Sequence, residues 1–98
     1  MIDNVTKHKR ICAELTELYE KKNHDYGDAF HLSYLEEGMA MPRIRIGDKF
    51  NRFKNLTKIS HMSEATKVRE ERLRDTLIDM ANYAIMTVME LDAEEGKR

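Results

Sequence analysis

Residues 74–86, in the last third of the chain, are apolar almost all the way round when drawn as a helix. At about 100° per residue, the polar exceptions Asp75, Asp79 and Asn82 fall within an arc of about 60°. A solvent-facing side would be wider and more mixed. Two carboxylates beside an apolar wall are costly to desolvate unless cations or a metal ion pair with them. The segment therefore predicts a long helix whose polar stripe is the best candidate for a functional site.

The remaining segments also have helical spacing, and no alternating β-branched run competes with it. Asp3 or Asn4 can cap the first helix, while Gly38 and Pro42 mark the junction before the third. The chain thus predicts one all-α domain, residues 1–98, built as a small bundle of three long helices and one short helix. We predict helices at about residues 4–22, 29–36, 43–59 and 63–94.

A chain of 98 residues with 41% hydrophobic content can form only a modest core. Such a core leaves the apolar last helix partly uncovered, so we expect a homo-oligomer, a dimer or higher. The single cysteine, Cys12, excludes an internal disulfide. Residues 1–7 lack the apolar core of a signal peptide and no run is long enough to span a membrane, so we expect a soluble, cytoplasmic protein.

The net charge of −1 gives no overall reason to expect nucleic acid as a partner. The charges are nevertheless segregated. Residues 43–58 contain six basic side chains and one acidic one, whereas residues 64–95 contain nine acidic and four basic ones. A basic helix facing an acidic helix could bind a phosphate together with a divalent cation. Ordinary salt bridges between the two helices explain the same pattern equally well.

The acidic candidates suit a hard cation. Mg²⁺ usually takes one or two carboxylates together with phosphate and water oxygens, and Asp75 and Asp79 are one helical turn apart. Asp48, on the basic helix, is a third candidate ligand. In the alternative interpretation, Asp75 pairs with Arg72 or with an arginine of a neighbouring subunit. Glu14 and Glu17 lie beside the apolar stripe of the first helix and could face the last helix, although such spacing is common on solvated helices.

Two further groups could bind a nucleotide. Residues 21–30 combine lysines, a turn carboxylate, aromatic rings and a glycine that allows close backbone approach, although an ordinary helix end and turn has the same composition. The stripe of Asp48, Arg52 and Asn55 on the basic helix, with Lys49 beside it, could be a ligand wall or a subunit contact. We expect Ile46, Phe50, Phe53 and Thr57 to form the buried side of that helix.

Other chemistries lack the necessary residues. The four histidines form no i, i+4 pair, and with one cysteine they provide no zinc site. Neither a phosphate-binding P-loop nor a dinucleotide-binding glycine motif is present.

Three blocks of sequence, in order, carry a family resemblance. They are Lys-Asn-His-Asp-Tyr-Gly-Asp-Ala-Phe at 22–30, Arg-Ile-Gly-Asp-Lys-Phe-Asn-Arg-Phe at 45–53 and Asp-Thr-Leu-Ile-Asp-Met-Ala-Asn-Tyr-Ala at 75–84. Together they resemble the nucleotide modification associated domain, a small helical family frequent in bacteriophages and prophages. The resemblance implies a role with nucleotides, in settings of phage DNA-base modification.

A more distant similarity is to the MazG-like all-α nucleoside triphosphate pyrophosphohydrolases. Those enzymes hold Mg²⁺ with Glu-x-x-Glu on one helix and Glu-x-x-Asp on a later one, and they release a monophosphate and pyrophosphate. The similarity implies that Glu14 and Glu17 match the first motif. Asp79 and Asn82 occupy the second in an altered form, with Asp75 one turn earlier.

These observations predict a nucleotide-binding protein, with Mg²⁺-dependent pyrophosphohydrolase activity as one candidate function. The alternatives are a protein that only sequesters a nucleotide, and a DNA-binding or adaptor bundle that uses the basic helix. The predicted catalytic residues are Asp75, Asp79 and Glu17, and the predicted metal ligands are Asp48, Asp75 and Asp79. The predicted nucleotide-binding residues are Lys22, Asp25, Tyr26, Gly27, Lys49, Arg52, Asn82 and Tyr83.

Overall fold

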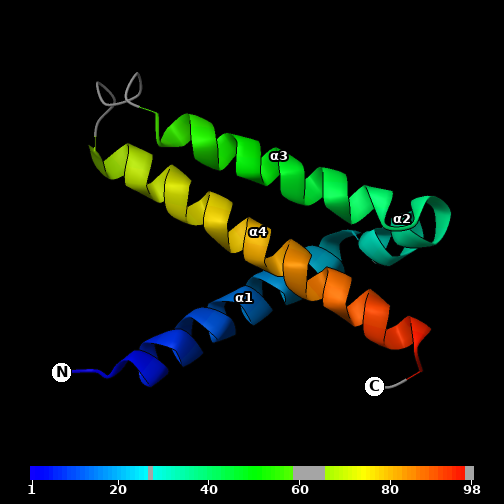
Figure 1. Cartoon of the computed structure of the whole chain (residues 1–98). Coiled ribbons are helices and arrows are strands. Elements are labelled where there is room, and N and C mark those ends of the chain that lie inside the picture. Colours follow the sequence, from blue (N-terminus) through cyan, green and yellow to red (C-terminus); the bar gives the residue numbers. More distant parts are fainter. Residues whose placement is uncertain (27, 59–65, 97–98) are drawn as a thin grey trace.

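The computed structural model describes residues 1–26, 28–58 and 66–96, with the backbone alone at residues 25, 26 and 66. These residues form four α-helices and contain no strand (Figure 1). The predicted all-α class, with three long helices and one short helix, is confirmed. The helices are α1 (Asn4–Tyr26), α2 (Ala29–Glu37), α3 (Ala40–Leu56) and α4 (Thr66–Glu94).

The helix ends follow from local chemistry. The Asp3 carboxylate accepts a hydrogen bond from the Thr6 backbone N–H at 2.8 Å, which caps α1 as predicted. Helix α1 continues four residues beyond its predicted end at Lys22, because residues such as Asn lower helix propensity by only about 0.7 kcal/mol or less. Gly38, with φ of 66°, ends α2 in a conformation that glycine adopts without steric cost. Pro42 lies in the first turn of α3, where a missing N–H breaks no helical hydrogen bond.

The four helices form an open assembly. Helices α3 and α4 run side by side and antiparallel, whereas α1 crosses α4 near the middle of α4 and its N-terminal part extends away from α4 (Figure 1). The radius of gyration is 15.8 Å, whereas a compact chain of about this length has about 13 Å. The predicted bundle is therefore only partly closed within one chain.

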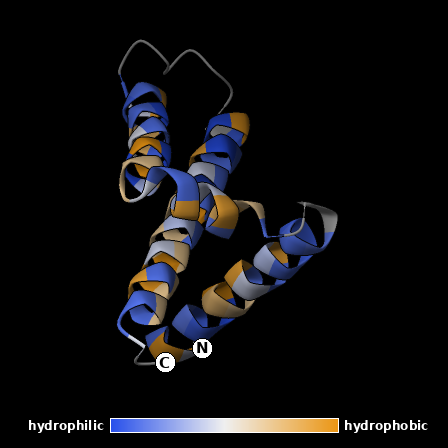
Figure 2. Cartoon of the chain, turned by 90° about the vertical axis from the view of Figure 1, so that its right-hand side faces the viewer, coloured by the Kyte–Doolittle hydropathy of each residue, from blue (hydrophilic) through white to orange (hydrophobic). Residues whose placement is uncertain are grey.

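The apolar core is correspondingly small, and apolar segments are spread over all four helices (Figure 2). The prediction of which side of α3 is buried is partly wrong. Phe50 is 50% exposed, where it stacks on Phe53 at 6.5 Å and lies under the Lys54 ammonium. Buried apolar side chains instead lie at the two ends of α3 and where α4 meets α1 and α2. They are Leu15, Tyr34, Met41, Pro42, Leu56 and Ile78.

Polar contacts fasten α1 to α4 where they cross. The Arg74 guanidinium donates two hydrogen bonds of 2.7 Å to the Glu14 carboxylate, and these bonds lower the pKa of Glu14. The buried Asn82 amide donates to the Leu15 carbonyl oxygen at 3.2 Å. The angle of α1 is thus fixed largely by side-chain hydrogen bonds. None of the described helices is long and apolar enough to cross a membrane.

Candidate functional site

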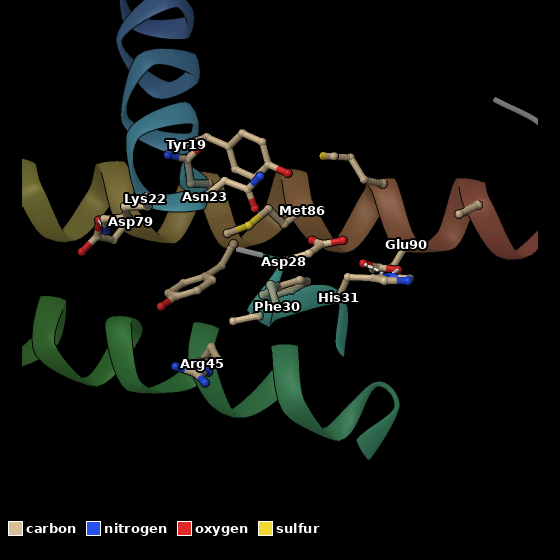
Figure 3. A pocket seen from close by; sticks show the side chains of 15 residues that line it. Tyr19, Lys22, Asn23, Asp28, Phe30, His31, Arg45, Asp79, Met86 and Glu90 are labelled. Carbon is tan, nitrogen blue, oxygen red and sulfur yellow. Dashed lines mark hydrogen bonds and ion pairs between the residues drawn. The ribbon is translucent and has the colours of Figure 1, made fainter. Parts of the chain in front are cut away.

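A cavity of about 650 Å³ opens where the C-terminal end of α1, the start of α2, and α3 meet α4 (Figure 3). Lys22 and Asp79 lie side by side at one end, His31 and Glu90 lie at the other, and Phe30 lies between them. The cavity therefore has two polar ends and a more apolar middle. Its lining is Tyr19, Lys22, Asn23, Asp28, Ala29, Phe30, His31, Arg45, Asp79, Asn82, Tyr83, Met86, Met89, Glu90 and Ala93.

The cationic end centres on Asp79. One carboxylate oxygen lies 3.4 Å from the Lys22 ammonium of α1, and the other lies 3.0 Å from the Lys49 ammonium of α3. The Asp79 side chain is 25% exposed, so both ion pairs remain accessible to a ligand. Arg45 lines the same cavity from α3 (Figure 3). The alternative of salt bridges between the basic and the acidic helix is thus confirmed for Lys49 and Asp79.

The middle of the cavity is aromatic. The Phe30 ring of α2 and the Tyr83 ring of α4 are nearly parallel, with an interplanar angle of 24° and centroids 6.2 Å apart. Tyr19 and Met86 add further apolar surface. Flat, partly exposed rings are suitable surfaces for stacking a planar heterocycle.

The other end contains a histidine–carboxylate pair. The Nδ1 atom of His31 lies 2.8 and 2.9 Å from the two oxygens of Glu90, which is only 9% exposed. Because an ionised carboxylate only accepts hydrogen bonds, Nδ1 of His31 carries a hydrogen and is the donor. This hydrogen bond raises the pKa of His31. One turn further on, the Tyr34 hydroxyl donates to Glu94 at 2.8 Å, which raises the pKa of Tyr34. The two pairs fasten α2 onto α4.

A second cleft of about 500 Å³ lies between α1 and α4 and shares Lys22 and Asp79 with the first cavity. The predicted catalytic residues Glu17, Asp75 and Asp79 all line it. The structure thus places Glu14 and Glu17 of α1 beside Asp75 and Asp79 of α4. The full lining is Glu14, Glu17, Leu18, Lys21, Lys22, Asp75, Ile78 and Asp79.

The predicted metal ligands are less close together. Asp48 is exposed on α3 and lines neither cavity. Asp79 faces two ammonium groups, and Asp75 lies beside Arg74. Among the described residues, no three histidine, cysteine, aspartate or glutamate side chains are positioned to hold a metal ion.

The remaining predicted residues divide into three groups. Lys22, Asn82 and Tyr83 line the first cavity, and Lys49 reaches it through Asp79. Arg52 instead donates from Nε to the buried Thr76 hydroxyl at 3.2 Å, which is a contact between α3 and α4. The predictions for Asp25, Tyr26 and Gly27 fall outside the residues whose side chains the structure describes.

Sequence reasoning missed several lining residues. Met86 and Glu90 continue the helical stripe of Asp79 and Tyr83, so extending that stripe by two turns would have found them. Phe30 belongs to the 21–30 group, whereas His31 gave no comparable signal, because only the tertiary fold brings α2 against α4.

Comparison with known families identifies the group to which this chain is related. The family described as nucleotide modification associated domain 1 matches residues 22–91. The chain belongs to this family. No match was found among curated proteins or among solved structures.

The nucleotide modification associated domain 1 match begins at Lys22 and includes most of the first cavity, with Arg45, Asp79 and Glu90. Glu14 and Glu17 lie before the matched region, so the second cleft is only partly built from it. The family description associates the chain with nucleotide modification. The first cavity is therefore the better candidate for a function related to that description.

Proposed function

We propose that this protein binds a nucleotide in the first cavity, with the phosphates at the end formed by Lys22, Lys49 and Arg45 and the base against Phe30 and Tyr83. The observation that carries this proposal is that one cavity, mostly within the matched family region, is lined by Lys22, Arg45 and two nearly parallel rings. A nucleotide has the same two parts, an anionic group and a planar heterocycle.

The size and charge of the cavity support the proposal. Small-molecule sites usually enclose about 300–1,000 Å³, and this cavity, at about 650 Å³, lies within that range. Asp79 offsets only part of the positive charge of Lys22, Lys49 and Arg45. A phosphate group with two or more negative charges would restore the balance. Lysine and arginine donors provide the charge-assisted hydrogen bonds that such a group needs.

Mg²⁺ fits only in part. Asp79 is occupied by two ammonium groups and Glu14 by Arg74, so the described residues do not form a complete metal site. Glu17 and Asp75 are both exposed and line the same cleft, and two carboxylates are a usual protein contribution to Mg²⁺ when phosphates supply further oxygens. In that case Glu17 and Asp75 would hold the ion, which would offset phosphate charge.

A second candidate function is Mg²⁺-dependent hydrolysis of a nucleoside triphosphate to a monophosphate and pyrophosphate. The observation that favours it is the second cleft, where four carboxylates adjoin the proposed phosphate end through Lys22 and Asp79. Asp79, which would not hold the ion, would accept the proton of the water that attacks the α-phosphorus, and pyrophosphate would be the leaving group. Binding without hydrolysis is the competing function. In a phage-encoded protein, such capture would weaken a host defence that uses a nucleotide in the cytoplasm.

The test is an incubation with a panel of nucleotides, in Mg²⁺ and in EDTA, read by mass spectrometry under native and denaturing conditions. A monophosphate and pyrophosphate formed only in Mg²⁺ would establish hydrolysis. An unchanged nucleotide retained by the native protein in EDTA would establish capture. If no nucleotide binds under either condition, the proposal is wrong. Steeply salt-dependent binding of DNA would then favour the basic surface of α3.

Variants locate the site. Lys22→Ala and Arg45→Ala should each weaken nucleotide binding about tenfold in calorimetry, because a hydrogen bond to a charged group contributes about 1.5 kcal/mol or more. Lys9→Ala is the matched control, since Lys9 is an exposed lysine of α1 that lines neither cavity. Equal effects of all three substitutions would show general charge attraction and would contradict a defined phosphate site.

A further inference from the structure

One face of α4 is apolar and uncovered. Five side chains form this face, which we call the outer stripe, and at about 100° per residue they lie within an arc of about 80°. Leu77 is 45% exposed, Val88 53% and Leu91 42%. The outer stripe lies opposite Met86, and therefore on the side of α4 away from the first cavity. Its members are Leu77, Ala81, Ala84, Val88 and Leu91.

The spacing of the outer stripe indicates that a helix covers it. Leu77, Ala84 and Leu91 recur every seven residues, with Ala81 and Val88 between them, which is the pattern of a seam between packed helices. Between Arg74 and Asp92 the face bears no charged side chain. The alanines near its centre allow two helix axes to approach closely. A small ligand or a flat surface would not require this repeat.

The outer stripe is complementary to itself. Reversing the helix about Ala84 places Leu77 opposite Leu91 and leaves Ala84 opposite its own copy. Such a match is what a twofold axis between identical chains requires. No described helix of the same chain covers this face, and the chain is more open than a compact chain of its length.

Charge selects the direction of the second copy. Residues 67–75 of α4 carry four basic and three acidic side chains, whereas residues 90–95 carry four acidic side chains and no basic one. With the axis at Ala84, an antiparallel pair places residues 90–95 opposite residues 73–78 of the second copy, where Arg74 and Asp75 leave no net charge. A parallel pair would place the two acidic ends side by side, which costs free energy through repulsion.

We propose that the outer stripe is the surface on which a second copy of this chain docks, with the two α4 helices antiparallel and the twofold axis at Ala84. This dimer leaves the first cavity of each chain open, because the cavity lies on the opposite side of α4. The proposal is therefore independent of nucleotide binding.

Cysteine cross-linking tests the axis. In a Cys12→Ser background, which removes the exposed native thiol, Ala84→Cys should form a disulfide-linked dimer under mild oxidation. Ala81→Cys should not, since an antiparallel pair separates its two copies by six residues of rise, about 9 Å, beyond the reach of a disulfide. Cross-linking of both variants would show a parallel pair, and cross-linking of neither would show that this face is not the interface. Either result overturns the proposal.

Mass measurement tests the surface. Light scattering at roughly 50 μM, a concentration at which weak dimers form, should give the unmodified chain the mass of a dimer. The Val88→Asp variant should have the mass of a monomer, because burying an unpaired carboxylate in the interface is costly. Circular dichroism should show unchanged helix content, because Val88 is exposed in the single chain. Leu35→Asp is the matched control, at a 66% exposed leucine of α2. A monomeric unmodified chain, or dissociation by Leu35→Asp alone, would refute the proposal.

Discussion

The substitution Asp79→Asn separates the two candidate functions, because it removes one charge while keeping the shape of the side chain. Asp79 is the carboxylate shared by the ammonium groups of Lys22 and Lys49, at 3.4 and 3.0 Å. Partly exposed ion pairs contribute about 0.2–1 kcal/mol each. The loss of both should lower the stability by about 0.5–2 kcal/mol. For a domain of this size, each 1 kcal/mol lowers the melting temperature by roughly 4–8 °C.

The same change should strengthen the binding of phosphate. Once Asp79 no longer neutralises Lys22 and Lys49, a bound phosphate gains the interaction that the carboxylate held, and it no longer faces a like charge. We expect this change to make the free energy of binding more favourable by about 0.5–1 kcal/mol, so nucleotide affinity measured in EDTA should rise about two- to fivefold. If the protein is a Mg²⁺-dependent hydrolase that uses Asp79, turnover should instead fall by tenfold or more, since general acid–base groups contribute about 10²–10⁴ in rate.

Calorimetry with and without EDTA, together with a pyrophosphate-release assay, distinguishes these outcomes. Asp48→Asn is the matched control, because Asp48 is an exposed carboxylate next to Lys49 in sequence that lines neither cavity. Unchanged affinity for Asp79→Asn would show that its lysines do not contact the phosphates. A tenfold loss in EDTA would show that the carboxylate itself binds the ligand. Either result refutes the cation cluster as drawn.

Three further predictions concern the contacts that hold the helices together. Glu90 raises the pKa of His31 in the folded chain. This pair therefore stabilises the fold fully at a pH below the unfolded-state histidine pKa of about 6.5, and the contribution is lost as the pH rises through the higher folded-state pKa. Melting temperatures at pH 6 and pH 8 should differ less in His31→Ala than in the unmodified chain. Asn82→Ala should destabilise the protein by about 1–2 kcal/mol in denaturant titrations, because it removes the buried amide that donates to Leu15, and an unchanged midpoint would contradict that role. Asp3→Ala should cost about 0.5–2 kcal/mol in the first turn of α1, seen as faster amide exchange at Thr6 but not in α4.

The sequence was most informative where a single residue decides the local backbone. Gly38, Pro42 and Asp3 each act through their own geometry or hydrogen bond, so the ends they mark agree with the structure to within a few residues. The acidic stripe was identified for a related reason. Asp75, Asp79 and Asn82 are placed together by helical spacing alone, and the structure sets them beside α1 and α3.

Tertiary arrangement was beyond the reach of the same reasoning. The burial of Phe50 was predicted from the pattern within α3, but burial depends on whether a neighbour covers that face, and here it is half exposed. The crossing of α1 over α4 depends on contacts such as Arg74 with Glu14 and Asn82 with Leu15, which are 60 and 67 residues apart in the sequence. A pattern within one helix contains no information about such pairs.

The position of Asp79 shows that the two interpretations of the charge pattern are compatible. Salt bridging between α3 and α4 and phosphate binding seemed to be alternatives, yet the Lys49–Asp79 pair satisfies the first and lies at the end of the cavity proposed for the second. A carboxylate between two ammonium groups keeps their positive charges close together, which repulsion would otherwise oppose. A ligand with more negative charge than Asp79 would compete with this carboxylate for the same two ammonium groups, which is why we expect Asp79→Asn to strengthen binding. The structural role of Lys22 and Lys49 and the binding role that we propose for them therefore depend on one arrangement.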